Sequence, residues 1–255
     1  MPGHTPPPPP TPAKKILLKD ITIPHLPSPY YHFEYNPDST VKFANFASGF
    51  TMYDFIYNGN RLSEMRNNIF VNHDTLRYQY DNTGKVDLIK YINDANVLYR
   101  VVFFTYTGDK LTQIEWNHKE GTVGYIIDRT LTLSYYDDGN LKKMTDHRPG
   151  INGQIESTFT TTFENYDNKI NVDGFSLIHD GIHDHLFLLP GVVIQKNNPR
   201  KETGSGGPGQ NAYTDDYTYT YNSDNTPSNK SGDFVWTSGS QVGQRFQTNS
   251  FYTYY

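Results

Sequence analysis

The sequence predicts an all-β protein: a long antiparallel meander of hairpin repeats that forms a curved or partly closed sheet. Aromatic residues make up 15% of the 255 residues, with 21 Tyr and 15 Phe, whereas the net charge is only −5. Disordered chains have few aromatic residues and a high net charge, so this chain is expected to fold. In addition, segments of alternating aromatic and polar residues recur about every 22 to 30 residues, and turn residues follow each of them.

The first 29 residues predict a tether outside the folded domain. Five consecutive prolines, Pro6 to Pro10, favour an extended polyproline II conformation. We interpret 1–29 as a disordered, Pro-rich stalk, although a ligand for a proline-binding module or an end without a role would share this composition. A single domain is then expected over 30–255.

Seven segments share one pattern, in which a strand ends on an aromatic residue, turn residues follow, and an aliphatic residue usually starts the next strand. Asn-Gly, Asp-Gly, Thr-Gly and Asn-Pro-Asp supply the positive or preset φ angles that a tight reversal requires. Each segment therefore predicts one β-hairpin. Five copies are clear and the last two are degenerate: Tyr31–Val41, Tyr53–Leu62, Leu76–Val86, Val102–Leu111, Leu131–Leu141 (with Tyr136 as the repeat tyrosine), Phe159–Ile170 and Tyr217–Thr226.

After each turn of the clear copies that follow the first, two apolar residues come three positions apart, as in Leu62 and Met65 or Val86 and Ile89. Strict alternation would place the two members of such a pair on opposite faces of the sheet. Either both faces are partly covered, or a β-bulge shifts the register at each hairpin. We favour the bulge, because it also adds the twist and curvature that a long meander needs.

The remaining elements follow from the same patterns. Roughly 12 to 14 antiparallel strands are expected, in a sheet long enough to twist and curl. An insert over 172–198 interrupts the meander, and a short helix is one conformation open to it. The last strands are expected around 213–222, 233–237 and 245–254.

The turn units, which read Tyr, Asp or Asn, two further residues, Gly, Asn or Lys, and Leu, resemble tyrosine–aspartate (Rhs-type) repeats. Residues 30–170 carry this likeness, and the segments Tyr166–Asn171 and Lys196–Pro199 extend it. In these features the chain resembles uncharacterised Bacteroidetes cell-envelope lipoproteins that carry such repeats behind a Pro-rich linker. Val172 stands where that family usually has proline. The resemblance implies a hairpin-repeat fold and a cell-envelope or extracellular location, and it implies no activity.

Composition argues against several classes of function and partner. The mild acidity, without a clustered basic face, argues against nucleic acid as a partner. The sequence has no cysteine, which excludes disulfides, thiolate metal sites and cysteine nucleophiles. No run approaches 18 apolar residues, so no transmembrane segment is expected. No signal peptide is visible, and a lipid anchor attached upstream of residue 1 would be compatible with the sequence.

The densest polar cluster contains His179, His183 and His185 together with two aspartates. Such a set could bind zinc or another transition metal, but Gly181 would break the helix that brings the first two histidines together. Ordinary solvated side chains in a surface connection are the favoured interpretation. The Asp-rich turns lack the ligand spacing of an EF-hand, and the Gly-rich segment 204–209 lacks the Lys of a phosphate loop. No cofactor is expected.

Trp116 and Trp236, with the exposed share of the tyrosines, are the predicted ligand-binding residues. Aromatic rings on a curved sheet can stack on sugar faces or grip a peptide, whereas the alternative is that they only build the core. The leading hypothesis is therefore a non-catalytic, envelope-tethered binding or scaffold protein, with a polysaccharide or a surface protein as its partner.

Two other classes of function stay open. A glycan hydrolase would need two carboxyl groups about 5–10 Å apart in a groove. A purely structural surface protein would use the repeats as a spacer or would assemble through edge strands. The sequence alone does not single out a pair for the hydrolase, although six glutamates are available: Glu34, Glu64, Glu115, Glu120, Glu156 and Glu164.

Overall fold

The computed structural model describes residues 15–69, 72–121, 124–151, 155–179, 187–207 and 210–255. These residues form sixteen strands and two short 3₁₀ helices, and they contain no α-helix. The strands are β1 Leu18–Thr22, β2 Tyr31–Tyr35, β3 Val41–Phe46, β4 Thr51–Asn58, β5 Arg61–Asn67, β6 Thr75–Tyr80, β7 Val86–Ile92, β8 Leu98–Thr107, β9 Lys110–Glu120, β10 Gly124–Tyr135, β11 Leu141–Arg148, β12 Ser157–Glu164, β13 Lys201–Ser205, β14 Ala212–Tyr221, β15 Pro227–Ser238 and β16 Arg245–Tyr254. The 3₁₀ helices are η1 Ala47–Gly49 and η2 Gly174–Ile178.

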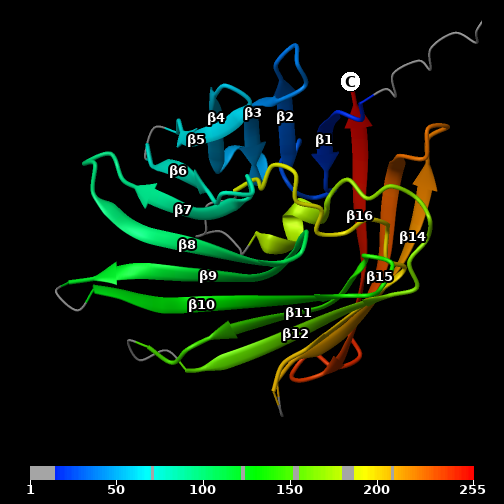
Figure 1. Cartoon of the computed structure of the whole chain (residues 1–255). Helices are drawn as coiled ribbons and strands as arrows, with labels where there is room; N and C mark the ends of the chain where they lie inside the picture. The colour runs from blue at the N-terminus through cyan, green and yellow to red at the C-terminus, as the bar shows by residue number, and fades with distance from the viewer. Residues whose placement is uncertain (1–14, 70–71, 122–123, 152–154, 180–186, 208–209) are drawn as a thin grey trace, which may run out of the picture.

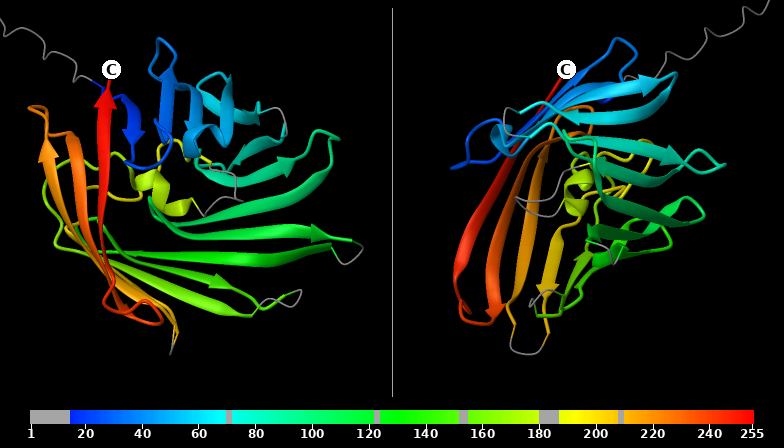
Figure 2. Two further views of the ribbon diagram at one scale, coloured as in Figure 1. Left: turned by 180° about the vertical axis from the view of Figure 1, so that it is seen from behind. Right: turned by 90° about the vertical axis from the view of Figure 1, so that its left-hand side faces the viewer.

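The strands follow one another in an antiparallel meander, and the sheet closes into a barrel because β1 pairs with both β2 and β16 (Figures 1 and 2). Ile21 lies opposite Tyr31 on one side and Tyr252 on the other. The all-β meander is thus confirmed, whereas the expectation of a curved or partly closed sheet with 12 to 14 strands is wrong. Closure leaves the barrel without an unpaired sheet edge.

Strand β1 lies inside the range 1–29 that the sequence assigned to a tether, so the barrel begins before residue 30. Leu18 and Ile21 are buried, and they belong to the same hydrophobic cluster as the rest of the barrel wall. The prolines at 24, 27 and 29, which we took as a continuation of the tether, instead lie in the connection from β1 to β2. Residues 1–14, which include the proline run, lie outside the described ranges.

The predicted β-bulges are confirmed. In the β4–β5 hairpin, Tyr57 lies opposite Leu62 but the preceding Ile56 lies opposite Glu64, so that Ser63 is an extra residue. Leu62 and Met65 therefore point to the same inner face, where both are fully buried. Equivalent shifts follow Glu34, Gln79, Thr105, Ser134 and Thr220. In the clear repeat copies after the first, the shift lets apolar residues three apart share one face, and such bulges add curvature to the sheet.

The Asp-rich turns are local hydrogen-bonding devices. In the turn after β6, the Asp81 amide donates to the Lys85 carbonyl, and the Asp81 carboxylate accepts bonds from the Thr83 amide and hydroxyl and from the Lys85 amide. Gly84 has a φ of 89°, which only glycine adopts without strain. The same turn follows β10, where Tyr136 takes the place of Asp81. The repeat position in that copy therefore belongs to Tyr135, and the alignment on Tyr136 is wrong by one residue.

Five of the repeat tyrosines join their hairpin to the preceding part of the sheet. Tyr80 donates its hydroxyl proton to the Leu62 carbonyl at 2.7 Å, while Arg61 lies over the Tyr80 ring. Because Leu62 starts the second strand of the preceding hairpin, this contact ties two repeats together. The same hydroxyl-to-carbonyl bond recurs between Tyr35 and Leu18, Tyr57 and Val41, Tyr135 and Leu111, and Tyr166 and Leu141.

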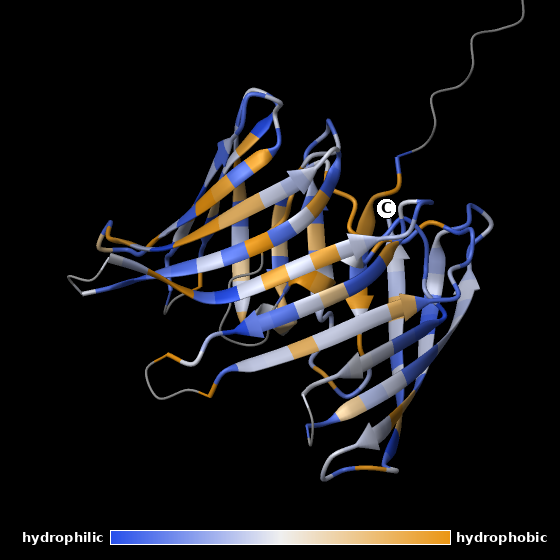
Figure 3. Ribbon diagram, turned by 60° about the horizontal axis from the view of Figure 1, so that its bottom comes forward, coloured by the Kyte–Doolittle hydropathy of each residue, from blue (hydrophilic) through white to orange (hydrophobic). Residues whose placement is uncertain are grey.

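Between β12 and β13, the described residues 165–179 and 187–200 reach into the interior of the barrel (Figure 2). Phe187 packs against Phe104 and Trp116 of the wall, and Ile178 and Ile194 are also buried. The described residues of the predicted insert 172–198 therefore form an internal plug, and the one helix among them is the short 3₁₀ helix η2. The strands around the plug show the expected alternation of hydrophilic and hydrophobic residues (Figure 3).

The two motifs at the ends of the plug lie side by side. Ile170 forms a β-bridge with Asn197, and the Asn198 side chain donates to the Ile170 carbonyl. Asn197 also bonds Asn140 of the wall through its backbone amide, at 2.9 Å. Tyr166–Asn171 and Lys196–Pro199 are thus the clamp that closes the plug and fastens it to the barrel.

Candidate functional site

A row of five aromatic rings lies on the inner face of the barrel, on β12, β14, β15 and β16. Tyr213 stacks on Phe159 and on Phe234, with ring centroids 6.1 and 4.7 Å apart. Trp236 meets both Tyr213 and Phe234 edge to face, and Phe246 continues the row beyond Phe234. The row faces inward because its members alternate in phase with buried residues of the same strands, as Tyr213 does with the buried Tyr217.

Gly204 on β13 makes room for the centre of this row. A Cβ atom at this position would lie 2.1 Å from the ring of Tyr213, which is directly opposite on β14. Any side chain here would force the Tyr213 ring out of its stacked position. Gly204, the first residue of the Gly-rich segment 204–209, is therefore part of a strand, and its lack of a side chain has a packing reason.

Beside the aromatic row, Glu202 of β13 and Asp215 of β14 lie directly opposite each other on the same inner face. The Glu202 carboxylate accepts hydrogen bonds from the Tyr213 hydroxyl at 2.5 Å and from the Tyr217 hydroxyl at 2.9 Å. Lys230 of β15 lies 4.0 Å over the Tyr217 ring. The aromatic row and the carboxylates are thus one connected group of side chains.

The carboxyl group of Asp215 lies in an environment that disfavours its charged form. The residue is 4% exposed, and its Oδ1 atom has no hydrogen-bond partner among the described residues. Burial, followed by the nearby charge of Glu202, raises the pKa of Asp215 to about 6. Gly232 leaves the space for this carboxyl group, because a Cβ atom there would lie 2.3 Å from Asp215 Oδ1.

The two tryptophans of the sequence prediction lie in different environments. Trp236 belongs to the aromatic row, where it is half-buried. Trp116 is 2% exposed and packs against Phe187 of the plug. Its other neighbour is Arg129, which lies 4.3 Å over the ring and forms two hydrogen bonds to the Asp146 carboxylate. Both tryptophans therefore point into the barrel, but Trp116 is buried in the core against the plug, and only Trp236 belongs to the aromatic row.

The histidine cluster is described only at its first member. His179 follows η2, and its Nδ1 atom lies 3.5 Å from the Tyr31 hydroxyl oxygen. His183 and His185 lie outside the described ranges. Elsewhere, the part of the chain that the structure describes contains no group of three or more His, Cys, Asp or Glu side chains arranged to hold a metal ion.

Sequence reasoning missed Glu202 and Asp215, and none of the six glutamates it considered belongs to the inner-face group. The available signals were the glycines inside strand-like segments, Gly204 and Gly232. A glycine in a strand interior indicates that another group approaches closely. Which group approaches depends on the pairing of β13 with β14 and of β14 with β15, and this pairing is not encoded in local sequence.

Within the described ranges, we find no helix with the length and hydrophobicity needed to span a bilayer. No protein-family model matches the sequence, and a search of curated proteins finds no match.

Solved structures share the fold. A porin-like protein from Bacteroides vulgatus has a TM-score of 0.61 and 14% sequence identity, over 94% of this chain and 99% of that chain. A porin-like protein from Bacteroides uniformis has a TM-score of 0.50 and 15% identity, over 94% and 95% of the two chains. A TcdB2-TccC3 structure aligns with 85% of this chain over only 13% of its own length. Its TM-score of 0.31 is too low to support an inference. At these identities the likeness shows the fold alone.

Proposed function

We propose that the protein is a non-catalytic carbohydrate-binding barrel of the bacterial cell envelope, with a polysaccharide as its ligand. The observation that carries this proposal is the row of aromatic rings on the inner face of β12, β14, β15 and β16. Rigid aromatic rings supply large contact areas at a small entropic cost, and the neighbouring polar groups fix orientation. Phe246, which ends the row, is 48% exposed and gives a ligand access to it.

The polar groups beside the row fit the hydroxyl groups of a sugar. Glu202 is half-buried and offers an acceptor, while Lys230 of β15 offers a donor. Such a mixed surface, with flat rings and hydrogen-bonding groups on one face, suits a ligand that is itself flat and apolar on its ring faces and polar at its rim. This chemistry favours a glycan over an extended apolar peptide.

The envelope location rests on the resemblance to cell-envelope repeat lipoproteins and on the porin-like Bacteroides neighbours. We propose binding rather than passage through the barrel, because the described residues of the plug occupy part of the interior and pack against the wall. The Pro-rich tether and the lipid anchor upstream of it are part of the same proposal.

Ion pairs on the outer face favour a barrel wall in contact with water. Glu64 of β5 pairs with Arg66 at 2.6 Å and with Arg77 of β6 at 3.0 Å. These side chains point away from the buried Met65 and Leu76, so they would face lipid if the barrel were embedded at this level. An arginine that faces lipid near the bilayer midplane costs about 2–4 kcal/mol. These ion pairs support our proposal that the barrel lies beside the membrane and not within it.

The test is affinity electrophoresis of the full chain in gels that contain single polysaccharides, combined with titrations that follow tryptophan fluorescence. Saturable retardation by one polysaccharide is expected, and Trp236→Ala and Phe246→Ala should each weaken it by about tenfold or more. Phe103→Ala is the matched control, because Phe103 is 43% exposed but lies on the outer face of β8. Retardation that all three variants retain, or none across the panel, would contradict the proposal and favour a protein partner or a structural role.

A glycan hydrolase is the second candidate, and the Glu202–Asp215 pair is the observation that favours it. Residues directly opposite each other on antiparallel strands have Cβ atoms about 5 Å apart, close to the carboxyl separation of retaining glycosidases. One member of the pair has a raised pKa, as a general acid requires. Binding is preferred because Asp215 is 4% exposed, which keeps a substrate from its carboxyl group.

Release of reducing ends from the retarding polysaccharide decides between the two candidates. The binding proposal expects no release by the wild-type chain at any pH between 4 and 8. Release that Glu202→Gln abolishes, while the polysaccharide still retards the variant, would establish the hydrolase instead.

A further inference from the structure

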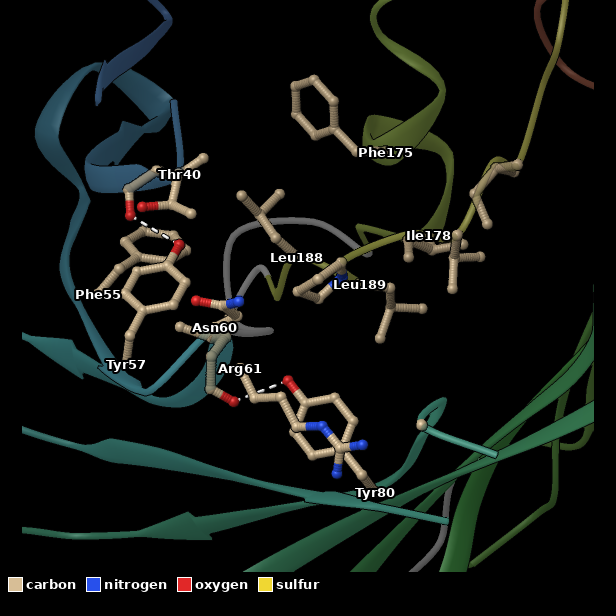
Figure 4. Close-up of a pocket in the computed structure, with 16 residues that line it drawn as sticks. Thr40, Phe55, Tyr57, Asn60, Arg61, Tyr80, Phe175, Ile178, Leu188 and Leu189 are labelled. Carbon is tan, nitrogen blue, oxygen red and sulfur yellow. Dashed lines mark hydrogen bonds between the residues drawn. The ribbon is translucent and has the colours of Figure 1, made fainter. Parts of the chain in front are cut away.

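A cavity remote from the aromatic row lies between the plug and the turn ends of the first three hairpins (Figure 4). Its volume is about 410 Å³, within the range of small-molecule sites. Val41, Phe55 and Leu62 line it from the barrel wall, and Ile178, Leu189 and Val192 line it from the plug. Because both walls are aliphatic or aromatic, water in this cavity would make few hydrogen bonds, and an apolar group would displace it favourably.

The polar groups of this cavity are gathered at its outer end. Thr40 and Asn60 come from the turns after β2 and β4, Arg61 is the first residue of β5, and Asn60 and Arg61 are exposed. The hydroxyl groups of Tyr57 and Tyr80 already donate to the carbonyls of Val41 and Leu62, as the dashed lines in Figure 4 show. Arg61 is therefore the principal group that brings a charge to the cavity.

The guanidinium carbon of Arg61 lies 5.3 Å from the centroid of the Tyr80 ring, and this contact helps to hold the positive charge in place. The cavity thus combines an apolar interior with one fixed cation at its mouth. A second apolar cavity of about 340 Å³ adjoins it, since Val41, Phe175 and Leu188 line both. The apolar surface therefore continues past the first cavity and can hold a chain longer than a single ring system.

From the shape, the lining and the charge, we infer that this cavity binds a single-chain amphiphile, an unbranched alkyl chain that ends in a carboxylate. The alkyl chain lies between the wall and the plug, and the carboxylate pairs with Arg61 at the mouth. A guanidinium favours a carboxylate because its fork of N–H groups matches the two oxygens. This site is independent of the proposed carbohydrate surface, since the two share no residue.

The experiment uses the full chain and 11-(dansylamino)undecanoic acid as a fluorescent probe, below its micellar concentration. Saturable enhancement of the dansyl emission is expected, with displacement by unlabelled decanoate, dodecanoate and tetradecanoate. Each added methylene should strengthen displacement by up to about fourfold, which corresponds to burial of one CH₂ group. Dodecan-1-ol, which keeps the chain but lacks the charge, should displace the probe less well than dodecanoate.

Two variants test the two ends of the site. Arg61→Gln should weaken binding of the probe by about three- to tenfold and abolish the preference for dodecanoate over dodecan-1-ol. Val192→Trp should abolish binding by filling the cavity. The matched control is Lys110→Gln, because Lys110 covers Tyr135 at 5.2 Å as Arg61 covers Tyr80, but it lies outside the cavity.

Circular dichroism and thermal unfolding of each variant show whether it is folded, and Arg61→Gln, at an exposed position, should unfold at the wild-type temperature. The inference is overturned if the probe does not bind saturably. It is also overturned if folded Arg61→Gln and Val192→Trp both bind the probe as the wild type does, or if dodecan-1-ol competes as well as dodecanoate.

Discussion

At the scale of single residues, the inner face of β13–β16 is shaped by positions without side chains. Gly204 and Gly232 each stand where a Cβ atom would collide with a neighbour, the Tyr213 ring in one case and the Asp215 carboxyl group in the other. Each glycine therefore lets a large or polar side chain lie flat on the sheet. A glycine in a strand interior weakens the strand. Its presence at these two positions therefore indicates that the inner face needs the space that a side chain would fill.

Asp215 makes the stability of the protein depend on pH. Its pKa is raised from an ordinary value of 3.8 to about 6, so the folded protein keeps a proton that the unfolded chain has already lost between these pH values. The free energy of unfolding should therefore fall as the pH rises from 4 to 6, by about 2–3 kcal/mol from this group, and stay level above. The contribution of the protonated Asp215 carboxyl group to the free energy of unfolding is fully present below pH 3.8 and is lost as the pH rises through 6.

The variant Asp215→Asn lacks this titration. Urea unfolding at pH 4, 5, 6 and 7 measures the free energy of unfolding of both proteins. As the pH rises over this range, the value of the variant should increase by about 2–3 kcal/mol relative to that of the wild type. Asp94→Asn, on an exposed turn, is the control, and its free energy of unfolding should change with pH as that of the wild type does. A constant difference between Asp215→Asn and the wild type at all four pH values would show that Asp215 titrates normally.

At the scale of secondary-structure elements, the hairpin is the unit and the tyrosine is its link to the next unit. Tyr80 and Tyr106 occupy equivalent positions in consecutive hairpins, and a cation, Arg61 or Lys85, covers each ring. They differ at the hydroxyl group. Tyr80 donates to the Leu62 carbonyl, whereas the buried Tyr106 hydroxyl has no hydrogen-bond partner within the described ranges.

This difference predicts opposite responses to loss of the hydroxyl group. Tyr80→Phe should lower the free energy of unfolding by about 1–2 kcal/mol, because the Leu62 carbonyl loses its bond to the tyrosine. Tyr106→Phe should leave stability unchanged or raise it, because a buried unpaired hydroxyl is removed. Equilibrium unfolding in urea measures both, and equal losses in the two variants would contradict the proposed link between repeats.

At the scale of the whole molecule, β1 decides whether the sheet closes. It pairs with β2 and β16, Tyr35 donates to the Leu18 carbonyl, and the Tyr255 amide donates to the Leu17 carbonyl. Without β1, the facing edges of β2 and β16 would present unpaired backbone groups, which recruit other strands.

A chain of residues 23–255 should therefore be less stable than the full chain and should associate, whereas a chain of residues 15–255 should match the full chain. Thermal unfolding and light scattering measure the two properties. A synthetic peptide of residues 15–24 should restore a monomer by adding the missing strand. If 23–255 is monomeric and as stable as 15–255, closure by β1 is not what holds the barrel together.

The sequence by itself determined the hairpins. The period-two alternation, the turn residues and the apolar pairs three apart are local signals, and they predicted the strands and the bulges that the structure contains, as at Leu62 and Met65. Local signals suffice here because a hairpin pairs residues that are close in the chain. The same reasoning placed Tyr136 one residue out of register, since two adjacent tyrosines satisfy the same pattern and only the pairing of Tyr135 with Leu141 separates them.

Only the tertiary structure decided what lies inside the barrel. The pairing of β1 with β16 joins residues more than 200 positions apart, and β1 follows a proline run that favoured a tether. The sequence predicted a surface insert for the plug, because its apolar residues, such as the buried Phe187, follow no strand or helix periodicity that would indicate burial. Glu202 and Asp215 became neighbours through strand pairing on the far side of that plug. Contacts of this kind depend on how the sheet closes, and closure is a property of all the strands together.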